Sequence, residues 1–455
     1  MNIYIKTYGC QMNERDSESA AAMLAAAGHR IVHAENEADL ILLNTCSVRE
    51  QAEIKAIGKL GILKRLKRER PWMRFGIMGC MAQSRGAELL EKIPHLDFAI
   101  GTDNIHLLPE TVAELEKGAC KVRHDLRMGA DTPGIDAHRL NEEDRPFSAF
   151  VSISRGCNRY CSYCIVPYVR GPERSRSMDS IVEEVEALTG QGVREVTLLG
   201  QNVASYGFDR RPPSEMPSDV SHFAELLTRI NDIDGIRRIR FTSPHPAYFN
   251  RKLIETVGAL PKVCKYMHLP LQSGSDPVLK RMNRPYTAAR YLEIVNELRA
   301  LAPEMTFSTD IIVGFPGETE EDFEATRQMM LAVRYDNAYI FKYSPRKGTV
   351  SARLYPDDVP QTEKERRNQV LLAELEKINA ENNAALIGRE FELLAEGPSK
   401  RNAARWMGRT DTFKQVIFDA PESLRKGDFV NARIVRATAM SLYGEVTSSK
   451  SQDSR

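Results

Sequence analysis

The chain lacks long hydrophobic runs and an excess of charge of either sign. No segment reaches the roughly twenty consecutive apolar residues of a membrane-spanning helix. The first residues, MNIYIKTYGC, lack the basic and apolar regions of a secretory signal peptide. The 63 basic and 62 acidic side chains leave a formal charge of +1, so any basic surface must be local. We therefore expect a cytoplasmic protein that does not bind membranes.

Cysteine is scarce and unevenly placed. The 455 residues contain eight cysteines, and a chain of this length without an export signal is expected to keep them reduced. Reduced cysteines are either buried apolar side chains or ligands for a metal. Six of the eight fall into two groups of three, whereas Cys120 and Cys264 lack such a context and are expected to be structural.

The first domain, expected over residues 1–118, alternates strands with helices. Predicted strands over NIYIKTYG, ADLILLNT, MRFGIMG and DFAIG are separated by segments with helical periodicity, an order typical of a parallel sheet. Cys10, Cys46 and Cys80 each follow one of the first three strands, about one strand–helix unit apart. Because the carboxyl ends of parallel strands meet at one edge, we favour shared metal ligation over three unrelated buried cysteines.

Two further domains are expected after a polar linker over residues 119–142. Six strand–helix units over residues 143–373 predict a partial TIM-like (βα)6 barrel, with its chemistry at the carboxyl ends of the strands. Short alternating strands over residues 376–440 predict a small antiparallel β-barrel of the nucleic-acid-binding kind, on which the other two cores are not expected to depend. Residues 447–455 are expected to form a disordered tail.

The second group of cysteines lies in RGCNRYCSYC, directly after the first predicted barrel strand. A zinc site or a fully ligated iron–sulfur cluster usually has four protein ligands, but no fourth cysteine or histidine lies near Cys157, Cys161 and Cys164. This spacing fits a 4Fe–4S cluster with one open iron. It resembles the radical S-adenosylmethionine (radical SAM) superfamily. The resemblance implies that the methionine part of this cofactor fills the open position and that these cysteines generate a 5′-deoxyadenosyl radical.

Later barrel strands end in segments that suit such a cofactor. Gly200 and Gln201 end the second strand in LLGQNV, Gln272 ends the fourth in LPLQSGS, and Gly314 ends the fifth in DIIVGFPGE. A glycine at a strand end is usually a turn, and an isolated glutamine is usually solvated. Only their order along the barrel marks these residues as cofactor-binding candidates. The resemblance implies contacts with the amino-acid end, the ribose and the adenine in turn.

Taken together, the two cysteine groups resemble the methylthiotransferase family. YGCQMNERDSE, NTCSVRE, GCMAQ, MHLPLQSGSD and RWMGRTDTFKQVIF match its motifs over nearly the whole chain, and CNRYCSYCIVPYVRG is most similar to its MiaB-type, tRNA-modifying branch. The resemblance implies an auxiliary 4Fe–4S cluster on Cys10, Cys46 and Cys80, and a C-terminal TRAM domain. It also implies radical insertion of a methylthio group at carbon 2 of N6-dimethylallyladenosine beside the anticodon, with two S-adenosylmethionine molecules per turnover.

The expected partners are a tRNA anticodon stem-loop with a prenylated adenosine and an electron donor such as flavodoxin or ferredoxin, with the protein as a monomer. Single-stranded RNA is bound by stacking and local positive charge. Candidates in the third domain are Lys400, Arg401, Arg405, Trp406, Arg409 and Lys414, although Trp406 could instead fill the small barrel. Candidates behind the radical loop, for phosphate or the cofactor carboxylate, are Arg170, Arg174 and Arg176.

Three other functions stay open at the level of the sequence. Methylthiotransferases that act on an aspartate of a ribosomal protein, or on threonylcarbamoyl-adenosine in tRNA, would keep both cysteine groups. The tyrosine-containing loop NRYCSYC and the basic third domain favour the dimethylallyl-adenosine enzyme. An iron–sulfur RNA-binding sensor without catalysis belongs to a different class. RNA binding without production of deoxyadenosine would distinguish the sensor.

Overall fold

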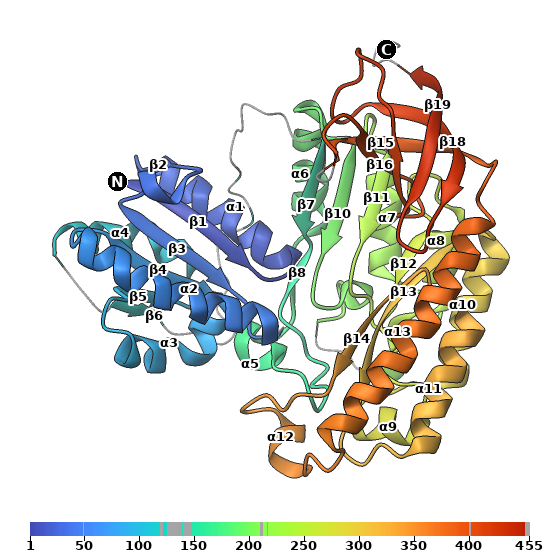
Figure 1. Cartoon of the computed structure of the whole chain (residues 1–455), viewed down its shortest axis with the longest axis horizontal. Coiled ribbons are helices and arrows are strands. Elements are labelled where there is room, and N and C mark those ends of the chain that lie inside the picture. The colour runs from blue at the N-terminus through green and yellow to red at the C-terminus, as the bar shows by residue number, and fades with distance from the viewer. Residues whose placement is uncertain are drawn as a thin grey trace.

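The structure is a computed structural model, and it describes residues 1–48, 50–118, 122–124, 136, 139, 147–209, 213–215, 217–399 and 402–450. Figure 1 shows three bodies, in the order expected from the sequence. Most of the expected linker lies outside the described residues, as do Cys120, Lys400 and Arg401. None of the helices in the described part of the chain combines the length and apolar composition needed to cross a membrane.

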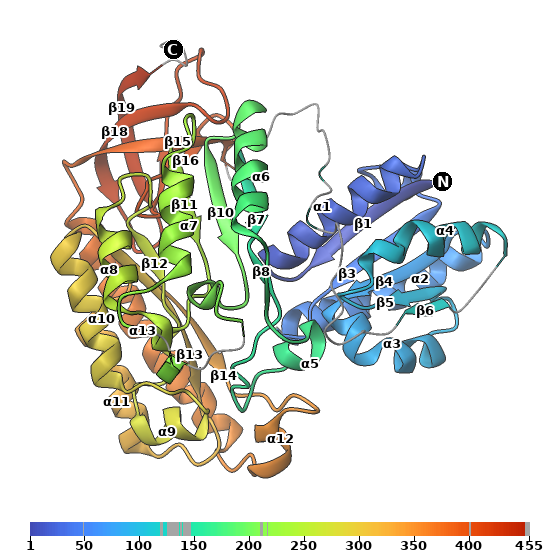
Figure 2. The ribbon, with the colours of Figure 1, turned by 180° about the vertical axis from the view of Figure 1, so that it is seen from behind.

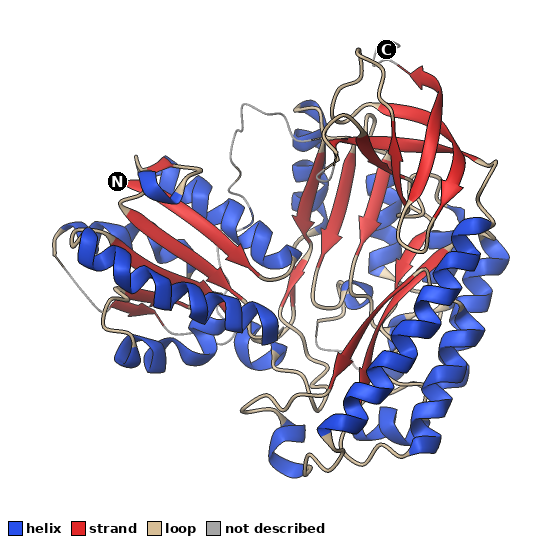
Figure 3. Cartoon of the chain, in the orientation of Figure 1, coloured by secondary structure: helices blue, strands red, loops and turns tan. Residues whose placement is uncertain are grey.

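The N-terminal domain is a six-stranded parallel sheet with helices on both faces (Figure 3). Side chains alternate between its faces, so Leu40 and Leu42 pack under α1 and α4 while Ile41 and Leu43 pack under α2 and α3. The short edge strands β2 and β6 were not expected. In sheet order, the strands are β2 (Arg30–Ile31), β1 (Asn2–Tyr8), β3 (Leu40–Thr45), β4 (Arg74–Gly79), β5 (Phe98–Ile100) and β6 (Val122–His124). The helices are α1 (Gln11–Ala26), α2 (Glu50–Glu69), α3 (Cys80–Lys92) and α4 (Leu108–Glu116).

The central domain is an open barrel of six parallel strands. Two three-stranded sheets, β7-β10-β11 and β12-β13-β14, are joined by a parallel bridge between Ile239 and Val263. This arrangement confirms the expected partial TIM-like barrel. The strands are β7 (Ser148–Ser152), β10 (Glu195–Leu199), β11 (Arg238–Phe241), β12 (Tyr266–His268), β13 (Thr306–Val313) and β14 (Asn337–Lys342). A small antiparallel pair, β8 (Ser154–Arg155) and β9 (Arg174–Ser175), follows the first strand.

Helices cover the outside of this barrel and begin at residues that cap them. Ser177, Ser221, Asn250 and Thr287 each accept a hydrogen bond from the first turn, and Thr319 forms a full capping box. The long helices are α6 (Met178–Gly190), α7 (His222–Asn231), α8 (Arg251–Ala259), α10 (Ala288–Leu301), α11 (Glu320–Val333) and α13 (Gln361–Ala384). The short ones are α5 (Val166–Arg170), α9 (Asp276–Arg281) and α12 (Val350–Leu354).

The C-terminal domain is a closed five-stranded barrel in the order β15-β16-β17-β19-β18. The pairings are antiparallel except for β17 with β19, which is parallel and was not expected. Because α13 continues to Ala384, the barrel begins later than residue 376. The last strand extends to Lys450, so residues 447–450 form part of a strand instead of the expected tail. The strands are β15 (Glu390–Pro398), β16 (Trp406–Arg409), β17 (Gln415–Phe418), β18 (Phe429–Ala437) and β19 (Leu442–Lys450).

The two outer domains pack on different parts of the central barrel. Thr306, the first residue of β13, donates to the carbonyl oxygen of Thr412 at 2.7 Å, and Lys414 pairs at 2.7 Å with Asp336, which precedes β14. The C-terminal barrel therefore covers the amino ends of the central strands. The N-terminal domain lies beside the first strand of the central barrel, where α1 packs against β7, and α5 stands between the two bodies in both views (Figures 1 and 2).

Candidate active site

The register of the N-terminal sheet aligns the three strand ends that carry cysteines. Tyr8 of β1 pairs with Thr45 of β3, and Thr45 pairs in turn with Gly79 of β4. Cys46 and Cys80 follow their strands at once, and Cys10 follows β1 after one further residue. Cys10 is the N-cap of α1 and Cys80 is the first residue of α3, positions where the helix dipole favours a thiolate. The structure thus places all three cysteines at one edge, as the sequence predicted.

A pair of buried asparagines lies under this edge. Asn13 Nδ2 donates to Asn44 Oδ1 at 2.8 Å, and Asn44 Nδ2 donates back to the carbonyl oxygen of Asn13 at 2.7 Å. Gly79 has a φ of 90°, and a Cβ atom there would stand 2.4 Å from Asn44 Oδ1. Only glycine therefore fits immediately before Cys80.

The thiols of this edge act on one another. Burial raises the pKa of Cys80 to about 12, Arg170 lowers it, and the neighbouring Cys46 and Cys10 raise it further. Three thiols in mutual reach are a donor set for iron or zinc. Among the described residues, no group of three or more histidine, cysteine, aspartate or glutamate side chains is arranged to hold a metal ion. Thiolates are the usual ligands of iron–sulfur clusters, so these cysteines would supply the donor type that such a cluster needs.

The radical loop carries the second cysteine group and is closed on itself. Cys157 N donates to the carbonyl oxygen of Gly171 at 3.1 Å, and Cys164 N donates to that of Cys161 at 2.9 Å. Gly156 has a φ of 81°, and a Cβ atom there would lie 2.0 Å from the carbonyl oxygen of Pro172. Because the chain turns so tightly, the three thiols share one short loop.

Burial controls the protonation of these thiols. Burial raises the pKa of Cys164 to about 12, with Cys161 acting in the same direction. Burial also raises the pKa of Cys157, with Cys164 as the next cause. Ligation requires thiolates, so the positive charge of bound iron must offset the burial. Arg284 lies 3.7 Å from Cys161 Sγ and adds a positive charge on the protein side.

Two of the predicted cofactor residues abut the radical loop. Gln201 Oε1 accepts from Gly156 N at 2.5 Å, and a Cβ atom on Gly200 would stand 2.5 Å from Ser154 Oγ. Gln272 is buried with a φ of 68°, and its backbone nitrogen donates to Asp310 O at 2.8 Å. These three residues lie at strand ends of the barrel, where a cofactor of the radical loop would bind.

The fourth candidate, Gly314, has a different neighbour. Its φ is 69°, and a Cβ atom there would stand 2.3 Å from the side chain of Lys364 on α13. Its backbone nitrogen donates to Glu318 Oε1 at 2.7 Å. Packing against α13 therefore accounts for glycine at this position in the structure.

Sequence reasoning missed a group of unpaired polar atoms at the same end of the barrel. Among the described residues, the buried side-chain atoms there without a hydrogen-bond partner include Ser152 Oγ, Ser154 Oγ, Arg159 Nε, Asn202 Nδ2 and His245 Nε2. Buried polar atoms are costly unless a partner satisfies them. A polar ligand bound beside the radical loop would supply those partners, so the site fits S-adenosylmethionine. The signals were Asn202 in LLGQNV and His245 in TSPHP, each just after a strand.

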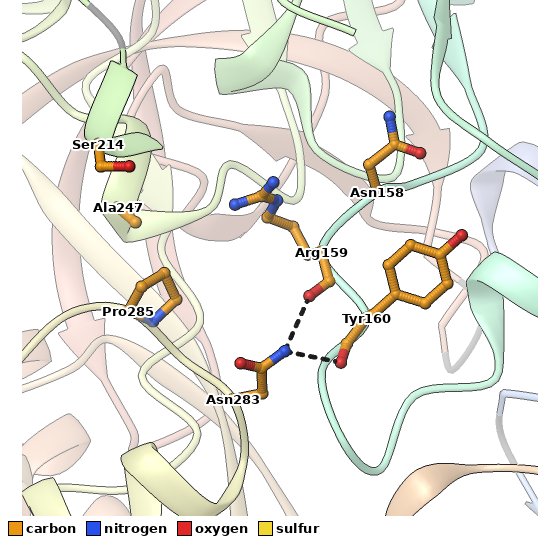
Figure 4. Close-up of a pocket in the computed structure, with 7 residues that line it drawn as sticks. All are labelled: Asn158, Arg159, Tyr160, Ser214, Ala247, Asn283 and Pro285. Carbon is orange, nitrogen blue, oxygen red and sulfur yellow. Dashed lines mark hydrogen bonds between the residues drawn. The ribbon is translucent and has the colours of Figure 1, made fainter. Parts of the chain in front are cut away.

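A cavity of about 570 Å³ opens beside the radical loop (Figure 4). Asn283 Nδ2 donates to Tyr160 O at 3.1 Å and fixes one wall, and the Tyr160 ring is 46% exposed. The Arg159 guanidinium lies over the Tyr248 ring, 5.0 Å from its centroid. In Figure 4 the Arg159 side chain points toward Ser214 and Ala247, whereas the Tyr160 ring points away from them. The cation suits a phosphate, and the exposed ring next to the cavity suits a nucleobase. The lining residues are Asn158, Arg159, Tyr160, Ser214, Ala247, Asn283 and Pro285.

The three arginines behind the radical loop bond to other residues of this chain. Arg170 donates to Asp16 of the N-terminal domain at 3.0 Å, and Arg174 donates to Asp103 of that domain at 2.8 Å. Arg176 pairs with Glu184 and donates to Ser152 O at 2.7 Å. In the structure each guanidinium therefore joins segments of the chain, whereas the sequence had suggested these arginines for phosphate or for the cofactor carboxylate.

The described basic residues of the C-terminal domain differ in exposure. Arg405 bonds Asp419 at 2.8 Å on the surface, and such exposed pairs are easily exchanged for a phosphate. Arg409 pairs with Glu396 at 2.9 Å, and Lys414 is held by Asp336. Trp406 is half-buried and packs on the barrel core. Arg405 is thus the candidate in this domain that is most open to RNA.

The open (βα)6 barrel with its three-cysteine loop defines a radical SAM protein. Residues 151–330 match the radical SAM superfamily, residues 2–101 match the uncharacterised protein family UPF0004, and residues 384–447 match the TRAM domain. The chain is similar to proteins named tRNA-2-methylthio-N(6)-dimethylallyladenosine synthase. It is 49% identical to that of Opitutus terrae, covering 98% of this chain and 97% of the relative, and 46% identical to that of Akkermansia muciniphila, covering 97% and 98%. The chain belongs to this family of synthases.

Solved structures share the fold at low sequence identity. The radical SAM methyltransferase TsrM from Kitasatospora setae, with cobalamin and a 4Fe–4S cluster bound, aligns with a TM-score of 0.55 at 13% identity over 77% of each chain. The cobalamin-dependent enzyme OxsB aligns with a TM-score of 0.52 at 12% identity, over 83% of this chain and 56% of its own. Superfamily membership implies one 4Fe–4S cluster and S-adenosylmethionine as cofactors.

Proposed function

We infer that this protein is a tRNA methylthiotransferase that inserts a methylthio group at carbon 2 of N6-dimethylallyladenosine beside the anticodon. Near-full-length similarity to synthases of that name, at 44–49% identity, carries the inference. The reaction explains the need for radical chemistry. Carbon 2 of a purine is not acidic, so a general base and a nucleophile could not functionalise it readily, whereas a carbon radical can abstract its hydrogen.

Cys157, Cys161 and Cys164 are the thiols that would hold the radical-generating cluster. When bound, the cluster and S-adenosylmethionine supply the electron and the carbon radical. The chain itself orients the cofactor through the unpaired atoms of Ser154, Asn202 and His245. Burial lowers the pKa of His245 well below its usual value. The imidazole is therefore neutral. Because Nδ1 accepts from Ala247 N at 3.2 Å, Nε2 carries the proton and is free to donate a hydrogen bond.

Cys10, Cys46 and Cys80 would hold a second 4Fe–4S cluster, which keeps the sulfur to be transferred. Their places at one edge of the sheet, the burial of Cys46 and Cys80, and the packing of Cys80 next to the radical loop support this assignment. Cys80 packs against Ile165 and Val169, which directly follow the radical cysteines. The two cysteine groups are thus separated by only the short helix α5, so the target base can reach both sites.

The target adenosine would enter at the cavity beside the radical loop. Tyr160 offers an exposed ring there, with Tyr168 6.2 Å away in an edge-to-face arrangement. An adenosine in a tRNA loop must leave the stack before its carbon 2 can face a radical. Exposed tyrosines at the opening stabilise the unstacked bases, and the apolar surfaces of Ala247 and Pro285 suit a dimethylallyl group.

The proposed function also includes an RNA-binding role for the third domain, an electron donor and a monomeric state. The C-terminal TRAM barrel would bind tRNA backbone through Arg405 and its neighbours, at the end of the central barrel remote from the cysteines. The electron donor would be a small carrier such as flavodoxin or ferredoxin. We propose that the protein acts as a monomer in the cytoplasm and uses two S-adenosylmethionine molecules per turnover.

Mass spectrometry of tRNA nucleosides tests the function. Cells that lack this protein should accumulate N6-dimethylallyladenosine without its 2-methylthio form, and the wild-type gene should restore the product while a Cys161→Ala gene should not. Unchanged tRNA together with an altered ribosomal-protein aspartate, or altered threonylcarbamoyl-adenosine, would identify one of the rival methylthiotransferases. RNA binding by the reconstituted protein without any deoxyadenosine would support the sensor instead.

A further inference from the structure

A five-residue helix, α5, connects the two cysteine groups. It begins two residues after Cys164, and Ile165 and Val169 pack with Cys80 in one buried cluster. Thr102 of the N-terminal domain donates to the carbonyl oxygen of Val169 at 2.6 Å. The helix belongs to the central domain in sequence but packs against the cysteine edge of the N-terminal domain. A shift of α5 would therefore move both sites.

The last residue of α5 brings a buried positive charge to that edge. Arg170 is 4% exposed, and its Nη2 donates to Asp16 Oδ2 at 3.0 Å. Asp16 is fully buried on α1, the helix that Cys10 caps. Its other oxygen accepts from Nη1 of Arg155, just before the radical cysteines, at 2.8 Å. One carboxylate is thus shared by two arginines that flank the radical loop.

Arg170 shares its carboxylate partner. Among the described residues, Arg155 has a second carboxylate in Asp136, 2.8 Å away, whereas Arg170 donates in that part of the chain to the carboxylate of Asp16, which Arg155 also contacts. Burial opposes the charge on Arg170, yet Cys80, Asp16 and Cys10 hold its pKa well above the usual value. An arginine side chain is charged at any physiological pH. Its neighbour Val169 packs with Cys80 in one cluster, and its partner Asp16 lies on α1, which Cys10 caps, so this charge lies at the cysteine edge. Such a charge acts strongly because the interior screens it poorly.

We propose that Arg170, a residue of the central domain, is a positioning residue for the auxiliary site. Its positive charge raises the reduction potential of the cluster held by Cys10, Cys46 and Cys80. Its hydrogen bond to Asp16 keeps that site aligned with the radical loop. A positive charge nearby stabilises the more negative, reduced form of a cluster, and local charge is one of the factors that set cluster potentials. The inference rests on the proposed function, because it assumes a cluster on those three cysteines.

The test is a redox titration, followed by electron paramagnetic resonance, of the reconstituted full-length protein with S-adenosylmethionine present. The cofactor perturbs the signal of the cluster that binds it and so separates the two. Arg170→Gln should shift the reduction equilibrium of the other cluster at least about tenfold toward the oxidised form, about 59 mV for a one-electron couple. Arg170→Lys, which keeps the charge, should restore most of the wild-type potential. Arg174→Gln is the matched control, because it also breaks an ion pair between the domains, with Asp103.

Iron content separates the possible failures. A wild-type protein with about four irons would contradict the second cluster and thus the proposed function. A protein with about eight irons whose auxiliary potential is the same in wild type and Arg170→Gln would overturn this inference alone. If the Arg170→Gln protein fails to hold the second cluster, the redox titration is repeated on Asp16→Asn. Removal of that negative charge should shift the auxiliary potential upward, and an unchanged or lower potential would overturn the proposal.

Discussion

Arg238, the first residue of β11, donates a hydrogen bond from Nη1 to the carbonyl oxygen of Arg409 in the C-terminal barrel at 2.7 Å. Its other nitrogen, Nη2, donates to the carbonyl oxygen of Glu392 at 2.8 Å. Arg240, two residues along the same strand, donates to those of Thr410 and Asp411 at 2.8 Å each. Both arginines are at most 5% exposed. The C-terminal barrel therefore closes the amino end of the central barrel and supplies acceptors for two buried charges.

Deleting the chain from Arg389 onward should consequently destabilise the central domain as well as weaken tRNA binding. The deletion removes the acceptors of Arg238 and Arg240 and the Phe413 ring that stacks on Tyr266. It also exposes to water the surface that the barrel covers, including the cores around Tyr266 and Arg238, so the central domain loses packing as well as hydrogen bonds. Thermal unfolding of the truncated and full-length proteins measures the loss. This outcome revises the expectation that the other two cores are independent of the third domain.

Arg405→Gln tests RNA binding without the loss of stability that the deletion causes. Its partner Asp419 is exposed, so the ion pair contributes at most about 1 kcal/mol to stability. Affinity for tRNA should fall and depend less steeply on salt, because one phosphate contact is lost. Binding isotherms at several salt concentrations check this. An unchanged salt dependence would show that RNA does not contact this face of the barrel.

Cys161→Ala should abolish production of deoxyadenosine, because the radical site keeps only two thiols. The measurement is deoxyadenosine formed from S-adenosylmethionine and a chemical reductant. Cys264→Ala is the control, because this cysteine is buried just before β12, at the amino end of the central barrel, and belongs to neither cysteine group. A wild-type rate in Cys161→Ala would disprove the assignment of the radical loop.

Replacing Cys10, Cys46 and Cys80 together by alanine should halve the iron content, from about eight to about four per chain if each group holds one four-iron cluster. Deoxyadenosine should still form, because the radical loop is intact. Iron analysis and the deoxyadenosine assay on one preparation test both points. Retention of all the iron in the triple variant would show that these thiols do not hold a cluster.

Gly314→Ala should destabilise the protein by about 1–3 kcal/mol, because its φ of 69° strains any other residue and the new Cβ atom would press on Lys364. Gly190→Ala at the end of α6 is the control, since a Cβ atom there meets nothing within 4 Å. Denaturant unfolding gives the two free energies. Full stability of Gly314→Ala combined with weaker S-adenosylmethionine binding would assign this glycine to the cofactor instead.

Tyr160→Ala should weaken binding of an anticodon stem-loop, because loss of a stacking ring costs about 1–3 kcal/mol per base. Tyr160→Phe, which keeps the ring, should bind as the wild type does. In competition, the prenylated stem-loop should bind more tightly than the unprenylated one by about 1–3 kcal/mol. Equal affinity and equal turnover for the two stem-loops would identify another substrate.

The sequence by itself determined the architecture and the two cysteine groups. Buried parallel strands are recognisable as apolar runs, and a cysteine directly after such a strand has to lie at the carboxyl edge of the sheet. Cys10, Cys46 and Cys80 could therefore be placed together without coordinates, and the spacing of Cys157, Cys161 and Cys164 is local. The sequence failed to predict short elements. An edge strand such as β2 has only two residues, too few for a recognisable pattern.

Only the tertiary structure decided what the charged residues do. Arg170 and Arg405 look alike in sequence, yet one is buried against Asp16 and the other pairs with Asp419 on the surface. The partner of Arg170 lies 154 residues away, and no local pattern records a contact that two folded domains create. The same holds for Arg238, whose acceptors are backbone carbonyls of another domain. A charge is visible in a sequence, but its burial and its partner depend on which surfaces meet when the domains pack.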